Sequence, residues 1–306
     1  MGTREQWLEL RRAGVGGSDA AAALGQSPYV TRLELYFDKI GQQVPRDMDA
    51  AGVERTDFGR ALEGVIADQY ARRFNVRLRR RNQILRHPKY PFMLANIDRL
   101  VEGQRRGVEI KNVDAMAYRF GEWGEPGSDE VPTPYLLQTV HYMSVCDYPV
   151  WDIGACVGGN RLVVYHIERD AELEQMLIEG EALFWQYVER REPPPPDFDH
   201  PTTIGLLKRM YPGTDGGTID LPAEIQAWHQ VRLDADAQTK LYQAVADGAR
   251  AHILHAMANA AVGRLPEGGQ YRRKAIHREA YTVPPCDYQT LTFAKAKAAD
   301  TKENNE

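Results

Sequence analysis

Long apolar runs are absent from this 306-residue sequence. A transmembrane helix needs about 18 consecutive apolar residues or more, so no segment is expected to span a membrane. The opening segment, MGTREQWLELRRAG, is charged and lacks the apolar stretch of a secretory signal. The two absences together predict a cytoplasmic protein without a membrane partner.

Cysteine is scarce: the chain has three, Cys146, Cys156 and Cys286. They are scattered, whereas an iron–sulfur cluster needs four cysteines and a structural zinc site needs closely spaced ligands. The sequence therefore predicts no iron–sulfur cluster. Three unpaired thiols fit a reducing cytoplasm, in which they are buried or neutral.

A net positive charge is also lacking. The formal charge of −5 argues against a protein that coats nucleic acid with its whole surface. However, residues 71–91 contain eight basic side chains and no aspartate or glutamate. Such a stretch suits a phosphate backbone, but a solvated helix end and strand edge have the same composition, so both interpretations stay open. The eight are Arg72, Arg73, Arg77, Arg79, Arg80, Arg81, Arg86 and Lys89.

What is present suffices for a core, since 43% of the residues are hydrophobic. Periodic apolar positions and turn residues predict helices and strands in alternation, hence an α/β fold with a mixed sheet and flanking helices. Ser18 or Asp19 is expected to cap a helix over AAAALG. The expected helices cover 31–40, 56–74, 134–146 and 170–191, and the expected hairpins join strands 91–102 with 106–113 and 150–157 with 161–168.

A proline run at 193–196 ends the last of these helices and indicates a domain boundary. We therefore predict a core domain over 1–196 and an extension over 197–306. The extension should hold a helix capped by Asp220 and running to about Ala261, then strands over 271–285 and 288–296. Its polar end is expected to be disordered.

Three residues on the 91–113 hairpin point to chemistry. Glu109 and Lys111 are two apart on a strand and share a face, and the hairpin can bring Asp98 beside them. Two carboxylates at one point repel each other unless a cation neutralises them, and hard oxygen ligands suit Mg²⁺ or Mn²⁺. Such a metal activates water and phosphate, and a neighbouring lysine can orient or deprotonate that water.

This pattern is weak alone, because a strand Glu and Lys two apart are often a surface ion pair. Two helical features support it. Glu63 lies one turn after Gly59, which would allow a close approach, although Glu63 could simply pair with Arg60. Gln138 and Tyr142 share a helix face, although they could be a partly buried polar pair.

In this order, these residues resemble the motif series of RecB-like and lambda-exonuclease-like nucleases of the PD-(D/E)xK superfamily. The segment 7–41 also resembles the start of the YqaJ viral recombinase family, and the whole resemblance covers roughly residues 5 to 192. The extension has no counterpart in the compact lambda enzyme and resembles that of larger YqaJ-type proteins. The motif residues are Gly59, Glu63, Asp98, Glu109, Ile110, Lys111, Gln138 and Tyr142.

The resemblance implies a restriction-endonuclease-like core with a Mg²⁺ site, in which Mn²⁺ can substitute. Asp98, Glu109 and the Ile110 carbonyl would bind the metal, and Glu63 would support a second metal or its water. Lys111 would assist the attacking water. Gln138 would orient the site or contact the scissile phosphate, and Tyr142 would contact the substrate.

The resemblance further implies 5′→3′ digestion of double-stranded DNA ends in phage or prophage recombination. A homotrimer would leave a 3′ overhang for a single-strand annealing protein in the bacterial host cytoplasm. Arg11 and Ser18 would hold the 5′-terminal phosphate, unless Ser18 is a plain cap. The alternatives are a site- or structure-specific endonuclease on the same fold and a non-enzymatic DNA-binding protein, and the intact metal-site residues disfavour the latter.

Overall fold

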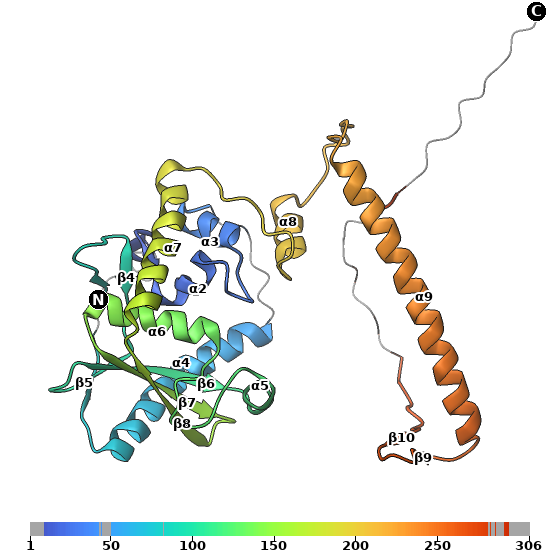
Figure 1. Ribbon diagram of the computed structural model, residues 1–306, viewed down its shortest axis with the longest axis horizontal. Helices are drawn as coiled ribbons and strands as arrows, with labels where there is room; N and C mark the ends of the chain where they lie inside the picture. The colour runs from blue at the N-terminus through green and yellow to red at the C-terminus, as the bar shows by residue number, and fades with distance from the viewer. Residues whose placement is uncertain are drawn as a thin grey trace, which may run out of the picture. The chain divides into compact units, whose positions relative to one another are not determined.

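The computed structural model describes residues 9–42, 44, 50–81, 83–280, 282, 285 and 291–293, so Cys286 lies outside the described part. The chain divides into two units, Met1–Pro212 and Gly213–Glu306 (Figure 1). No helix in the described ranges is both long and apolar enough to cross a membrane.

The first unit is built on a five-stranded mixed sheet with the order β2-β5-β6-β7-β8. The neighbours β6 and β7 are parallel, and the other pairs are antiparallel. The predicted mixed α/β fold and the predicted hairpin of 150–157 with 161–168 are therefore confirmed, and the other predicted hairpin is formed by β5 and β6 alone. The strands are β2 (Leu78–Arg79), β5 (Arg99–Val101), β6 (Arg106–Val113), β7 (Val150–Val157) and β8 (Arg161–Glu168).

A second, small sheet holds β1 (Val15–Gly16), β4 (Met93–Ala95) and β3 (Leu85–Arg86) in the order β1-β4-β3. The prediction of one strand over 91–102 was wrong, because β4 and β5 belong to different sheets. The chain changes sheet at residues 96–98, where neither glycine nor proline marks the break. This break places Asp98 at the junction of the two sheets.

Helices cover both faces of the large sheet (Figure 1). One face packs against α4 (Ala50–Phe74), whose Ile66 and Tyr70 belong to the same buried cluster as Val108. The other packs against α6 (Thr133–Cys146), which with α5 (Ala115–Phe120) forms the crossover between the parallel β6 and β7. Two further helices, α2 (Ala20–Ala23) and α7 (Ala171–Arg190), contact α6, and α3 (Arg32–Lys39) contacts both of them.

The predicted cap at Ser18 was wrong. Ser18 lies inside the short helical turn η1 (Gly17–Asp19), and the side chain of Asp19 accepts from the Gly16 backbone N–H instead. Asp19 itself precedes α2 without a side-chain capping bond. The start of α2 is therefore fixed by the contacts of Asp19. The Ser18 hydroxyl accepts a hydrogen bond from Arg11 instead.

The helix α8 (Thr203–Met210) belongs to the first unit, although it follows the proline run. Leu206 is 1% exposed in a cluster with Phe184 of α7. Arg209 also forms an ion pair of 3.2 Å with Glu34 of α3. The compact unit therefore ends at Pro212, beyond the boundary predicted at residue 196.

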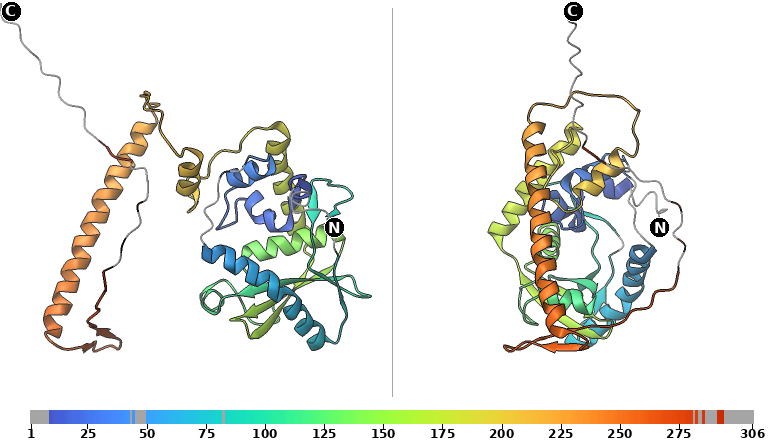
Figure 2. Two further views of the ribbon diagram at one scale, coloured as in Figure 1. Left: turned by 180° about the vertical axis from the view of Figure 1, so that it is seen from behind. Right: turned by 90° about the vertical axis from the view of Figure 1, so that its right-hand side faces the viewer.

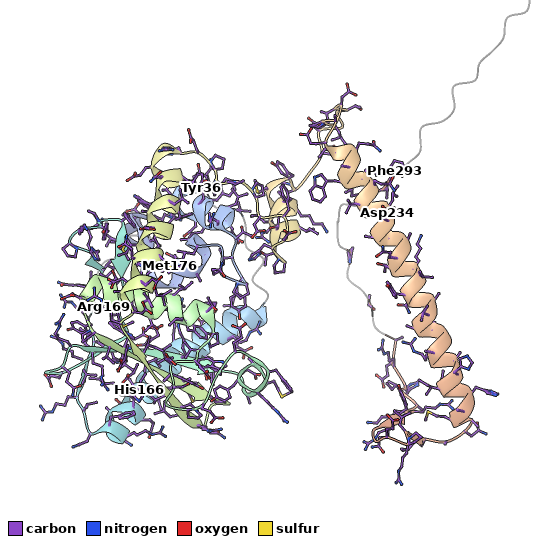
Figure 3. All side chains as sticks on the ribbon, in the orientation of Figure 1. Tyr36, His166, Arg169, Met176, Asp234 and Phe293 are labelled. Carbon is purple, nitrogen blue, oxygen red and sulfur yellow. The ribbon has the colours of Figure 1, made fainter. Side chains whose placement is uncertain are left out.

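The second unit holds α9 (Ile225–Met257) and a hairpin of β9 (Val262–Arg264) and β10 (Gln270–Arg272), which both views of Figure 2 show beyond the helix. The expected cap at Asp220 was wrong, because Glu224 precedes the helix. The hairpin lies earlier than predicted, and most of the strand expected over 288–296 lies outside the described residues. The ring centroid of Phe293, which Figure 3 labels, lies 4.4 Å from the ring centroid of His229 in α9.

Candidate active site

A pocket of about 220 Å³ lies where the two sheets of the first unit meet, and two of the three predicted carboxylates, Asp98 and Glu109, line it. Asp98 lies just before β5, and its Oδ2 accepts from the Ile110 backbone N–H at 3.0 Å. Glu109 lies in β6 and is 4% exposed. The register of the β5–β6 hairpin thus brings Asp98 beside β6, as the sequence predicted.

Lys111, Glu109 and Gln138 form one hydrogen-bonded group at this pocket. Lys111 Nζ donates to Glu109 Oε1 at 2.7 Å and to Gln138 Oε1 at 2.8 Å. Gln138 Nε2 donates to Glu109 Oε1 at 2.7 Å and to the Tyr142 hydroxyl at 3.0 Å. Strand alternation places Glu109 and Lys111 on the same face of the sheet, and Gln138 of α6 is hydrogen-bonded to both side chains.

The two carboxyl groups of the pocket have one ammonium group, that of Lys111, beside them. Burial, followed by the repulsion of Glu109, raises the pKa of Asp98 to about 8. Burial lowers the pKa of Lys111, but attraction by Glu109 outweighs it, so this pKa lies above its ordinary value. Glu109 Oε2 is buried without a hydrogen-bond partner. Two carboxylates that share one ammonium group therefore have a position for a further cation.

These residues fit the predicted metal, with one restriction. Among the described residues, no three His, Cys, Asp or Glu side chains gather closely enough to hold a metal ion. Asp98 and Glu109 supply two carboxylates with a vacant buried oxygen, and the Ile110 backbone lies beside them. A hard cation at this point would complete its coordination with the backbone, substrate or water, as Mg²⁺ commonly does.

Glu63 is not brought to the pocket. Its carboxylate pairs with Arg99 at 2.6 Å and with Arg80 at 3.1 Å. Space around Gly59 is open, since a Cβ added there would meet no atom within 4 Å, and the close approach expected at this glycine is not observed. Glu63 lies near enough to Asp98 to raise its pKa slightly, but its support of a second metal stays a prediction.

Arg11 and Ser18 do line the pocket, as part of a network that sequence reasoning missed. Arg11 donates to Ser18 Oγ at 2.9 Å and to Asp19 Oδ1 at 2.7 Å. The buried Lys39 donates to the other oxygen of Asp19 at 2.6 Å. Burial alone would raise the pKa of Asp19, but Lys39 and Arg11 together hold it at about 2.

Two further features of the pocket also escaped the sequence analysis. Asn96 lines it from the break between β4 and β5, with an exposed side chain. Gly17 lies against α6, where an added Cβ would come within 2.4 Å of the Tyr142 ring. The glycine is thus required for η1 to pack on α6, and the sequence signal for it was the pair Gly16-Gly17.

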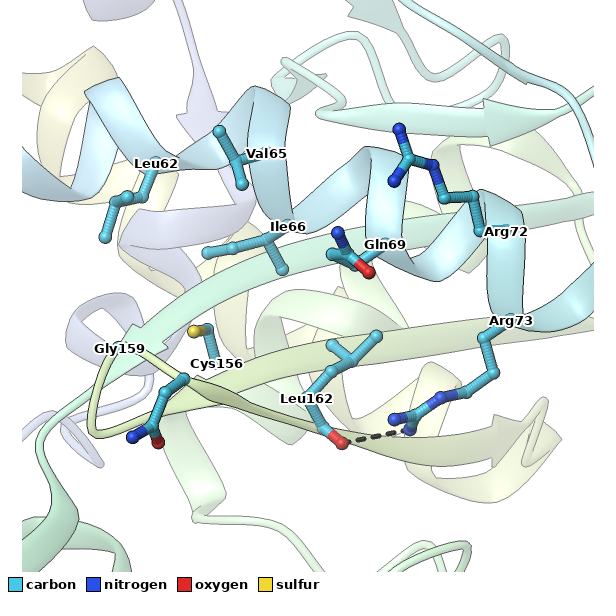
Figure 4. Close-up of a pocket in the computed structure, with 10 residues that line it drawn as sticks. Leu62, Val65, Ile66, Gln69, Arg72, Arg73, Cys156, Gly159 and Leu162 are labelled. Carbon is cyan, nitrogen blue, oxygen red and sulfur yellow. Dashed lines mark hydrogen bonds between the residues drawn. The ribbon is translucent and has the colours of Figure 1, made fainter.

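A larger groove of about 740 Å³ lies elsewhere, between α4 and the β7–β8 hairpin (Figure 4). Its lining includes Leu62, Ile66 and Arg72, and it contains no carboxylate. Arg73 donates to the Leu162 carbonyl across it at 2.9 Å. The candidate metal site is therefore the smaller pocket, where the acidic residues converge.

The sequence matches the family of the YqaJ-like viral recombinase domain over residues 6–149. It is also 35% identical over 264 residues to an uncharacterized protein YqaJ of Bacillus subtilis (strain 168). That match covers 85% of this chain and 80% of the relative.

Two solved structures are similar at low sequence identity. An alkaline exonuclease (LHK-Exo) from Laribacter hongkongensis has a TM-score of 0.49 and 17% identity, over 61% of this chain and 94% of that chain. A phage related exonuclease from Haemophilus somnus 129PT has a TM-score of 0.44 and 15% identity, over 60% and 99%. Since the Bacillus relative matches across most of both sequences, the chain belongs to the YqaJ-like viral recombinase family.

Proposed function

We propose that this protein is a Mg²⁺-dependent 5′→3′ exonuclease that digests double-stranded DNA from its ends. The observation that supports it best is the convergence of Asp98 and Glu109 at one pocket, where Lys111 is hydrogen-bonded to Glu109 and Glu109 Oε2 is buried without a partner. Buried polar oxygens are rarely left unpaired, so this atom is suited to a ligand. Membership of a family described as viral recombinases agrees with DNA as the substrate.

In this proposal Asp98, Glu109 and the Ile110 carbonyl hold Mg²⁺, and Mn²⁺ can replace it. The bound metal would polarise the scissile phosphate and acidify a water molecule. Lys111 lies beside Glu109 with a raised pKa, which keeps its amino group protonated at neutral pH. Lys111 therefore donates hydrogen bonds to the attacking water and offsets transition-state charge, rather than removing a proton.

Gln138 acts by holding Glu109 and Lys111 in place, since its amide contacts both side chains. Its remaining hydrogen bond to the Tyr142 hydroxyl ties the group to a buried ring. Side chains fixed in this way need little rearrangement when the substrate binds, which favours catalysis. Tyr142 would form the wall of the substrate site on the α6 side and contact the substrate there.

The preference for ends follows from Arg11 and Ser18, which line the same pocket as the carboxylates. The Asp19 carboxylate orients the Arg11 guanidinium. A terminal 5′-phosphate carries more charge than an internal diester, so a fixed arginine favours it. A homotrimer that works with a single-strand annealing protein in the cytoplasm completes the proposal, on the basis of the family resemblance.

The test is digestion of matched linear and covalently closed circular duplexes with Mg²⁺ and with a chelator. The proposal predicts release of nucleotides from linear DNA in Mg²⁺, with circles intact and no reaction in the chelator. Rapid cutting of closed circles would instead identify an endonuclease on the same site. No cleavage of either substrate would refute the nuclease assignment.

A further inference from the structure

All eight arginine and lysine residues between residues 71 and 91 are exposed. Four of them have local partners. Arg80 pairs with Glu63, Arg73 and Arg86 donate to backbone carbonyls, and Lys89 lies 5.0 Å from the centre of the Tyr90 ring. The other four are Arg72, Arg77, Arg79 and Arg81.

Within the described part of the chain, these four guanidinium groups form no ion pair or side-chain hydrogen bond. No aspartate or glutamate lies among residues 71–91 that could neutralise them. Grouped arginines without carboxylate partners repel each other and cost stability, so they indicate a binding surface for an anion. Arg77, Arg79 and Arg81 alternate along one short segment, and we call these three the edge arginines.

The strand pairing places the edge arginines beside the candidate active site. β2 pairs with β5, which begins directly after Asp98, and β3 pairs with β4, which ends shortly before it. The connection from β2 to β3 therefore passes the break that carries Asp98. Ile84, in this connection, lines the pocket itself.

The edge arginines also lie on the correct face of the sheet. Arg79 is directly opposite Leu100, and Leu100 belongs to the buried cluster beneath α6. Residues opposite each other share a face, so Arg79 lies on the face that carries Glu109 and Lys111. Arg77 follows by strand alternation, because its carbonyl continues the pairing by accepting from the Glu102 N–H.

Arg81 belongs to the same side. Burial raises the pKa of the Cys146 thiol to about 12, and the charge of Arg81 opposes this shift. Cys146 is the last residue of α6, so Arg81 lies within electrostatic reach of that helix. All three edge arginines are therefore assigned to the α6 side, on which Gln138 and Tyr142 meet the carboxylates.

The spacing matches a nucleic acid backbone. Residues 77 and 81 are separated by about 13 Å in an extended chain, at about 3.3 Å per residue. One strand of duplex DNA carries a phosphate for about every 3.4 Å of helix axis, so this span faces several phosphates of one strand.

We propose that Arg77, Arg79 and Arg81 form a track that binds the phosphate backbone of one DNA strand as it enters the Asp98–Glu109 pocket. This inference rests on the proposed function, since it takes DNA as the substrate. The track reads no base and contributes nothing to the chemical step. Its consequence is electrostatic: each phosphate contact should add about 0.9 to the slope of log affinity against log salt concentration.

The test compares two triple variants of the full-length protein. R77Q/R79Q/R81Q removes the track, and R232Q/K240Q/R250Q removes the same charge from α9 of the second unit. The probe is a fluorescent linear duplex, with its dissociation constant measured by anisotropy over a salt series in a metal chelator. The track variant should lose about 2.7 from the salt slope. The α9 variant and the charge-retaining R77K/R79K/R81K should keep it.

An unchanged slope in R77Q/R79Q/R81Q would overturn the track, and so would an equal loss in the α9 variant, which would indicate net charge alone. The track would also be contradicted if R77Q/R79Q/R81Q still bound DNA but lost binding to an acidic protein, because the arginines would then bind a protein partner. The proposed function is judged separately by whether the unmodified protein digests linear DNA in Mg²⁺. In that assay the track variant should show a raised KM and an unchanged kcat at saturating DNA. Thermal unfolding confirms that each variant is folded.

Discussion

Lys111→Met tests the charge balance of the pocket, because methionine keeps the apolar stem and removes the ammonium group. The change leaves the 4%-exposed Glu109 with Gln138 and with Asp98, whose pKa is already about 8. Removal of one member of a buried ion pair costs about 3–5 kcal/mol. Since 20% of the Lys111 side chain is exposed, we expect a smaller cost than this, about 2–3 kcal/mol.

Such a loss lowers the unfolding temperature by about 5–10 °C for a unit of this size. The expected loss appears in a chelator and shrinks in Mg²⁺, because a cation bound by Asp98 and Glu109 supplies the missing charge. Calorimetry in both conditions measures it, with the exposed Lys208→Met as the matched control. In the DNA assay, kcat should fall by about 100-fold or more with affinity almost unchanged. Equal unfolding temperatures of Lys111→Met and the unmodified protein in chelator would refute the reasoning.

Three further outcomes follow from the same contacts. A chain that ends at Pro212 should stay soluble, whereas one that ends at Pro196 lacks Leu206, exposes the cluster it covers and should aggregate on size-exclusion chromatography. Arg11→Ala should abolish faster digestion of 5′-phosphorylated over 5′-hydroxyl ends, measured as initial rates, and equal rates on both ends with the unmodified protein would contradict the phosphate pocket. The pKa of Asp19 is lowered to about 2, so its charge stabilises the fold above pH 4 and this contribution, about 2 kcal/mol, is lost as the pH falls from about 4 to about 2. Asp19→Asn should flatten unfolding free energy against pH in that window, and an unchanged curve would refute it.

Local patterns predicted the part of the site that depends on strand alternation and helical spacing. Glu109 and Lys111 share a face because they are two apart in β6, and Gln138 and Tyr142 share one because they are four apart in α6. The hairpin before β6 was marked by Gly103, which has a positive φ of 74°. These features required only neighbouring residues, so the sequence contained them.

The rest depended on contacts between distant segments. Glu63 looked like a ligand because it borders an apolar stripe, but the register of β5 brings Arg99 to it first. The role of Asp19 rests on Lys39, which lies on a separate helix. The boundary after residue 196 looked firm from its prolines, yet α8 folds back onto α3 and α7 through Leu206. None of these pairings has a local signal.

The central claim is that Asp98 and Glu109 bind the catalytic metal, and cleavage by Asp98→Ala and Glu109→Gln tests it most directly. The measurement is the initial rate of Mg²⁺-dependent digestion of a linear duplex, with the exposed Asp57→Asn as a matched control outside the pocket. The account predicts no detectable cleavage by either pocket variant, full activity of Asp57→Asn, and a cooperative thermal unfolding transition, which shows a folded protein, for all three. Activity of a pocket variant within about tenfold of the unmodified protein, a barrier change of about 1.4 kcal/mol, would contradict it.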